Sequence, residues 1–146
     1  MKYTTKVDID LSREKVIELF DNADNMEKWM EGLQSFEPIS GTPGQPGAKS
    51  KLKFKMGKRD MEMTETILVR NFPEEFTCSY EVDGVYNVVR NKFEELSENK
   101  TRYTTENDFQ FKSFAMKVMG FLMPGAFKKQ STKYLKAFKD FAESQA

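Results

Sequence analysis

The chain has 146 residues, 38% of them hydrophobic and 32% charged, and its 23 basic and 23 acidic side chains cancel. A chain of this length normally forms one domain with a core of its own, so we expect a single domain over residues 1–146. The balanced charge gives no electrostatic reason to expect DNA, RNA or an anionic membrane as the main partner, and we predict no nucleic-acid partner.

Two residue types limit the chemistry that the chain can perform. It has no histidine and a single cysteine, Cys78. Their scarcity removes the commonest general base, the Ser-His and Cys-His nucleophile systems and most zinc sites, so we expect no metal, no cofactor and no assignable catalytic residue. A lone cysteine forms no internal disulfide, and the first residues lack an apolar signal region. No segment approaches the roughly 20 apolar residues of a membrane span. We therefore expect a cytoplasmic location without stable membrane insertion.

The first part of the chain predicts one strand and two short helices. Residues 2–10 place alternate apolar side chains on one face, as in a half-buried strand. Ser12 can cap a helix whose apolar side includes Val16 and Phe20. A second short helix carries Trp29 at helical spacing with its apolar neighbours.

A series of strands follows. The loop at 41–47 holds three glycines and two prolines, and Asp83-Gly84 is a strong hairpin signal. Because the strands cluster instead of alternating with helices, the order predicts an α+β fold. The alternating segments are residues 35–40, 48–57, 59–70, 76–82, 85–96 and 101–111.

The C-terminal region predicts a long helix over about 113–143, broken at Pro124. Its first half is rich in Met and Phe, and its second half has a narrower apolar stripe. That stripe comprises Phe127, Ser131, Tyr134, Leu135, Phe138 and Ala142.

The order of elements resembles the helix-grip fold of the SRPBCC superfamily, which includes START, polyketide cyclase and birch-pollen-allergen-like proteins. The resemblance covers nearly the whole chain. It is carried by the opening strand with residues 11–20, Trp29, the loop at 44–47, the break at 123–124 and the segment 135–139. It implies a curved antiparallel sheet of about seven strands wrapped on a long C-terminal helix, with two short helices after the first strand.

A sheet that grips a helix tends to leave a cavity between them, and we place the function there. The resemblance implies binding of a small hydrophobic or aromatic ligand, such as a lipid or a polyketide-like molecule. One alternative is a cyclase or dehydratase-like enzyme using Glu65 with Tyr103 or Asn107, although the lack of histidine argues against it. Another is a chaperone-activator-like module that binds proteins through its outer surface. The residues expected to bind the ligand are Trp29, Leu33, Phe54, Met56, Met63, Glu65, Tyr80, Tyr103, Asn107, Met116, Met119, Gly120, Met123 and Phe127.

Several of these patterns also have a purely structural interpretation. The Met- and Phe-rich surface can be a flexible wall for a ligand or an ordinary core. Glu65, Asn87 and Asn91 stand in otherwise apolar registers. They can project into a cavity, or lie where a strand drifts to solvent or bulges. The lysines within 51–58 and 128–139 permit a weak contact with an anionic surface, but a solvated face explains them equally.

Overall fold

The computed structural model describes residues 1–146, apart from the side chains of Met56 and Pro124. The described chain confirms the predicted order of one strand, two short helices, further strands and a C-terminal helical region. A 3₁₀ turn, η1, lies between the short helices. The elements are β1 (Lys2–Ile9), α1 (Arg13–Phe20), η1 (Ala23–Asn25), α2 (Met26–Trp29), β2 (Leu33–Ser40), β3 (Lys49–Met56), β4 (Arg59–Asn71), β5 (Glu75–Val82), β6 (Val85–Ser97), β7 (Lys100–Phe111), α3 (Phe114–Leu122) and α4 (Pro124–Ser144).

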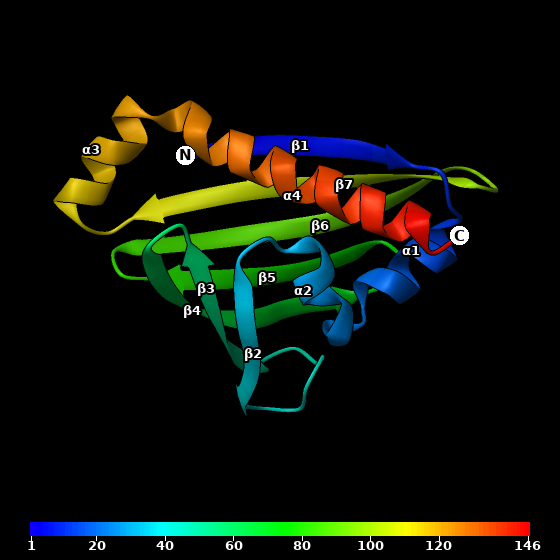
Figure 1. Cartoon of the computed structure of the whole chain (residues 1–146), viewed down its shortest axis with the longest axis horizontal. Coiled ribbons are helices and arrows are strands. Elements are labelled where there is room, and N and C mark those ends of the chain that lie inside the picture. The colour runs from blue at the N-terminus through cyan, green and yellow to red at the C-terminus, as the bar shows by residue number, and fades with distance from the viewer.

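The seven strands form one antiparallel sheet in the order β1-β7-β6-β5-β4-β3-β2. The sheet curves, and α4 lies across it along β1 (Figure 1). The predicted helix-grip fold is therefore confirmed. Pro38 lies in β2, an edge strand, where its missing N–H need not serve a second neighbour.

One predicted face is wrong at the end of β4. The alternation in the sequence places Val69 on the same face as Met63, Glu65 and Ile67. A register shift between Ile67 and Val69 turns Val69 outward, and its exposed fraction is 37%. The cause is a β-bulge, which adds a residue to one strand and reverses the alternation beyond it. Arg70 then reaches Asp21 through hydrogen bonds of 2.6 and 2.8 Å.

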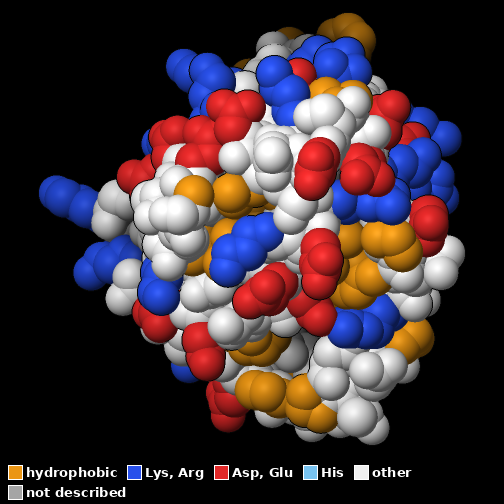
Figure 2. All heavy atoms as spheres, turned by 90° about the vertical axis from the view of Figure 1, so that its right-hand side faces the viewer, with side chains coloured by type: hydrophobic (Ala, Val, Ile, Leu, Met, Phe, Trp, Pro, Cys, Tyr) orange, Lys and Arg blue, Asp and Glu red, His pale blue; other side chains and the backbone are white. Residues whose placement is uncertain are grey.

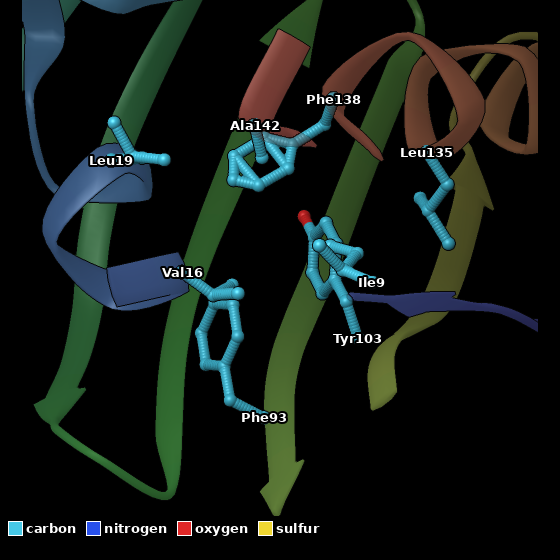
Figure 3. Close-up of a cluster of buried hydrophobic side chains, with 8 residues drawn as sticks. All are labelled: Ile9, Val16, Leu19, Phe93, Tyr103, Leu135, Phe138 and Ala142. Atoms are coloured by element: carbon cyan, nitrogen blue, oxygen red, sulfur yellow. The ribbon is translucent and has the colours of Figure 1, made fainter. Parts of the chain in front are cut away.

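The main core joins the C-terminal half of α4 to α1 and to one end of the sheet (Figure 3). Leu135, Phe138 and Ala142 are buried on α4 at intervals of three and four residues, as the predicted stripe requires. The cluster consists of Ile9, Val16, Leu19, Phe93, Tyr103, Leu135, Phe138 and Ala142.

Helix α3 departs from the prediction that the whole Met- and Phe-rich stretch covers the sheet. It lies beyond the end of β7 and at an angle to α4 (Figure 1). The predicted break is present, because α3 ends at Leu122 and α4 begins with Pro124 in its first turn. Separate helices can take separate directions, and α3 turns much of its apolar surface outward.

Candidate functional site

A row of polar side chains crosses the face of the sheet on which α4 lies. The strand register sets Ser50 opposite Glu65, Glu65 opposite Tyr80, and Tyr80 opposite Asn87. Paired residues share a face, so these side chains form one row across β3, β4, β5 and β6. We call this row, with its continuation on β7 and β1, the polar band. Its members are Ser50, Glu65, Tyr80, Asn87, Asn107, Thr105 and Thr5.

Hydrogen bonds carry the polar band from β6 to β1. Asn87 Nδ2 donates to Asn107 Oδ1 at 3.5 Å, and Asn107 Nδ2 donates to Thr105 Oγ1 at 3.3 Å. The hydroxyls of Thr105 and Thr5 share a bond of 2.7 Å. Asn87 Oδ1 is also buried, and it has no partner among the described residues. A buried acceptor without a donor costs about 1–3 kcal/mol, so this atom is the place in the band where a donor would stabilise most.

Glu65 supplies the unusual electrostatics of the band. Its side chain is buried, and no ion pair to it is found in the described part of the chain. Burial raises the pKa of the Glu65 carboxyl, and the hydrogen bond from the Tyr80 hydroxyl offsets part of that rise. Burial likewise raises the pKa of Tyr80 well above its usual range, and the charge on Glu65 adds to this. A carboxyl held toward its neutral form can donate a hydrogen bond as well as accept one.

Apolar side chains border the band on both sides. On β4, Glu65 lies between Met63 and Ile67, which belong to two different apolar clusters. Ser50 on β3 likewise separates Leu52 from Ala48, the residue just before that strand. On β6 and β7 the band borders the main core around Phe93 and Tyr103. The inner face is thus apolar with one polar stripe, a composition that suits small-molecule sites.

Helices α2 and α4 meet over part of this face. The Trp29 ring on α2 packs edge-on against Phe138 of α4 at a centroid distance of 5.1 Å. Lys133 on α4 bridges Glu31 at 2.8 Å, although both side chains are largely exposed. The indole Nε1 of Trp29 is buried without a hydrogen-bond partner among the described residues. Trp29 is therefore partly buried beside the short helices, with a free indole donor.

The sequence matches a known family over nearly its whole length. A family described as polyketide cyclase / dehydrase and lipid transport matches residues 1–143. The chain belongs to this family. No curated protein sequence matches it.

Solved structures of low sequence identity share this fold. The chain is similar to Ara h 8.0201, with 15% identity, a TM-score of 0.79 and coverage of 99% of this chain and 98% of that one. It is similar to the Zhui aromatase/cyclase of Streptomyces sp. R1128, with 11% identity, a TM-score of 0.80 and coverage of 98% and 93%. It is also similar to norcoclaurine synthase of Thalictrum flavum in complex with dopamine and hydroxybenzaldehyde, with 13% identity, a TM-score of 0.74 and coverage of 100% and 88%.

The structure brings several of the predicted site residues together on the inner face of the sheet. Glu65, Tyr80 and Asn107 lie in the polar band. Phe54 and Met63 belong to an adjoining apolar cluster, as does Leu33, which is buried. Tyr103 lies apart in the main core, where its hydroxyl donates to Asn91 at 2.6 Å. The side chain of Met56 lies outside the described part of the structure.

The helix residues divide into two groups. Gly120 is buried because the Phe111 ring lies against it, and Phe127 packs on Phe109 and Phe111 at 5.0 and 5.5 Å. Met116 is half-buried beside the turn at Gly84.

The prediction that Met119 and Met123 line the interior is wrong. Their exposed fractions are 44% and 57%. The reason is that α3 turns away from the sheet before the Pro124 break.

The predicted set omitted four residues of the polar band, namely Ser50, Thr5, Thr105 and Asn87. Ser50, Thr5 and Thr105 are small polar residues in otherwise apolar alternations, and this is the signal by which they could have been found. Asn87 was noted in an apolar register, but its place beside Tyr80 depends on how β5 pairs with β6. The partner of Glu65 is likewise Tyr80 and not Tyr103, as the pairing of β4 with β5 decides.

Two hollows of about 550 and 590 Å³ lie elsewhere on the surface. They share Arg13 and Glu95 and are lined mostly by polar and charged side chains. The end of the molecule with α1 carries mixed charges of both signs (Figure 2). Neither hollow includes a residue of the polar band.

Among the described residues, no group of three or more carboxylate, thiol or imidazole side chains is arranged to hold a metal ion. No helix that the structure describes is long and apolar enough to span a bilayer.

Proposed function

We propose that the protein binds a small hydrophobic or aromatic molecule, of lipid or polyketide-like type, between the sheet and α4. The apolar body of the ligand lies against Met63 and the neighbouring cluster, and one polar group of the ligand reaches the polar band. Membership of a family described as polyketide cyclase / dehydrase and lipid transport supports this class of ligand.

The observation that carries the proposal is a buried carboxyl and a buried, unpaired amide oxygen in the same polar band. Glu65 is buried with its pKa raised, and Asn87 Oδ1 is buried without a partner among the described residues. Neither arrangement improves the packing of an ordinary core, because a buried polar group costs free energy unless it is paired. A ligand hydroxyl could donate to Asn87, and a ligand carbonyl could accept from a neutral Glu65.

The wall around the band is suited to adjust to a guest. Met61, Met63 and Tyr80 are only partly buried although they face inward beside Leu52 and Phe54. Methionine has an unbranched, polarizable side chain that repacks at low cost. A ligand can therefore enter by displacing these side chains, without unfolding the sheet.

The first experiment is native mass spectrometry of the purified protein, followed by displacement of a bound apolar dye such as ANS. We expect a co-purified small molecule or saturable dye binding. Met63→Trp should reduce dye binding by filling the inner face. Met119→Trp is the matched control, because residue 119 is exposed on α3 and the same substitution there should leave inner-face binding intact. Equal dye binding in both variants, with no co-purified molecule, would contradict the proposal.

Glu65→Gln and Glu62→Gln test whether the polar band selects the ligand. Both residues lie on β4, but Glu62 is on the outer face and pairs with Lys51 at 3.3 Å. We expect Glu65→Gln to change the preference between ligands that carry a hydroxyl, a carbonyl or no polar group. Glu62→Gln should leave that preference unchanged.

A second candidate function is an acid-base reaction at Glu65, as in a dehydration. The observation that favours it is the raised pKa of a buried carboxyl beside a tyrosine hydroxyl. In such a step the Glu65 carboxyl gives its proton to a leaving hydroxyl, which departs as water. The carboxylate then takes the proton from the neighbouring carbon, so that a C=C bond forms and the acid is restored.

Binding and catalysis are separated by one comparison. If Glu65 is the acid, Glu65→Gln should stop water loss from a β-hydroxycarbonyl substrate while retaining substrate binding. If the protein only binds, the wild type should return such a substrate unchanged, as mass spectrometry would detect.

A further inference from the structure

Helix α3 carries an apolar stripe that faces outward. Phe114, Val118, Phe121 and Leu122 follow one another at intervals of four, three and one residues, which places them on one side of a helix. Their exposed fractions are 83%, 39%, 84% and 69%. Single exposed apolar residues are ordinary, but a contiguous set of this size marks an interaction surface.

The opposite side of α3 is fixed to the domain, so the stripe is held outward. A Cβ at Gly120 would come within 2.6 Å of the Phe111 ring, which shows how closely the helix approaches the end of β7. Ser113 caps the helix by accepting a hydrogen bond from the Met116 amide at 3.2 Å. The cap itself packs against the β5–β6 turn at Gly84.

The segment of the sequence that contains the stripe is basic. The segment 109–139 contains seven lysines and no acidic residue, which leaves 16 basic against 23 acidic residues in the rest of the chain. The balanced total therefore hides a strong separation of charge. Ion pairs engage Lys133 and Lys139 with Glu31 and Glu143. The others in the segment are Lys112, Lys117, Lys128, Lys129 and Lys136.

We propose that α3 docks the protein on the surface of an anionic lipid bilayer. The helix is about 14 Å long, too short to span, so it lies in the interface with Phe121 and Leu122 among the acyl chains. The lysines on α3 and at the start of α4 then lie at the level of the headgroups. Exposed aromatic and aliphatic side chains combined with lysines are the composition that interfacial helices use on anionic membranes.

The same charges argue against a second copy of the chain as the occupant. A symmetric contact through the stripe would bring Lys117 of both copies toward each other, with no acidic residue on α3 to neutralise the two charges. Lipid phosphates provide that neutralisation. The proposal does not depend on whether the inner face binds a ligand, since α3 lies outside the polar band.

The test is co-sedimentation of the full chain with vesicles of phosphatidylcholine, alone or with about 30% phosphatidylglycerol. We expect binding to the anionic vesicles, roughly tenfold weaker binding to the neutral ones, and weakening by salt. Phe121→Ser combined with Leu122→Ser should reduce binding at least about tenfold. The matched control replaces Ile39 and Leu68, which are 49% and 41% exposed on strands, and should bind as the wild type does.

A second pair of variants tests the charge. Lys128→Glu with Lys129→Glu should weaken binding to anionic vesicles, whereas Lys53→Glu with Lys55→Glu, on an exposed strand face, should not. Circular dichroism establishes that every variant is folded. Equal binding to both vesicle types, no binding, or no effect of the serine variant would each overturn the proposal. So would light scattering that finds a wild-type dimer which the serine variant dissociates.

Discussion

Truncation of Phe138 to alanine tests whether α4 is held by the main core. Phe138 is fully buried, and its ring lies 5.1 Å from Trp29, 5.5 Å from Tyr103 and 6.0 Å from Phe20. Phe→Ala substitutions in cores cost about 3–5 kcal/mol, since they lose burial and leave a cavity. Rigid rings from α1, α2 and β7 surround this site and cannot easily collapse into the space. We therefore expect a loss of about 4 kcal/mol in the free energy of unfolding.

The assay is urea unfolding followed by circular dichroism, with thermal unfolding beside it. A domain of this size has about 5–15 kcal/mol of stability, so the variant should still fold. Its Tm should fall by about 8–16 °C. Phe114→Ala is the matched control, because Phe114 is 83% exposed and its loss should change stability by less than about 0.5 kcal/mol. A loss below about 1.5 kcal/mol for Phe138→Ala, or equal losses in both variants, would refute the reasoning.

Three further predictions concern charge and reactivity. The free energy of unfolding of Glu65→Gln, relative to that of the wild type, should grow as the pH rises from about 4 to 8. The pKa of the Glu65 carboxyl is raised in the folded protein, so the wild type loses stability as the pH rises above the ordinary carboxyl range, whereas glutamine does not titrate. Urea unfolding of the variant and the wild type over this pH range measures the difference. Cys78 should react with Ellman's reagent only after unfolding, since it is buried and its thiol pKa is raised. Arg70→Leu should lose about 1 kcal/mol by removing the bridge to Asp21, and about 1 M NaCl should reduce that difference between variant and wild type.

Local signals in the sequence were sufficient for the elements and the fold class. Alternation sets which face a strand residue takes, so the inward position of Glu65 and Asn107 could be predicted before any pairing was known. The hairpin at Asp83-Gly84 and the break at Pro124 could be predicted because turn and helix-breaking residues act through their own backbone. The bulge after Ile67 could not, since it arises from how two strands pair.

Contacts between distant segments decided the rest. Alternation shows that Glu65 and Tyr80 face inward, but only the register of β4 with β5 makes them neighbours and leaves Tyr103 in the core with Asn91. The apolar stripe of α3 has the same spacing as one that packs on a core, because periodicity records only that one side of a helix is apolar. Whether that side packs on the sheet or is exposed depends on the direction that the chain takes at Ser113 and Pro124, the two ends of α3. That direction is a property of the tertiary structure.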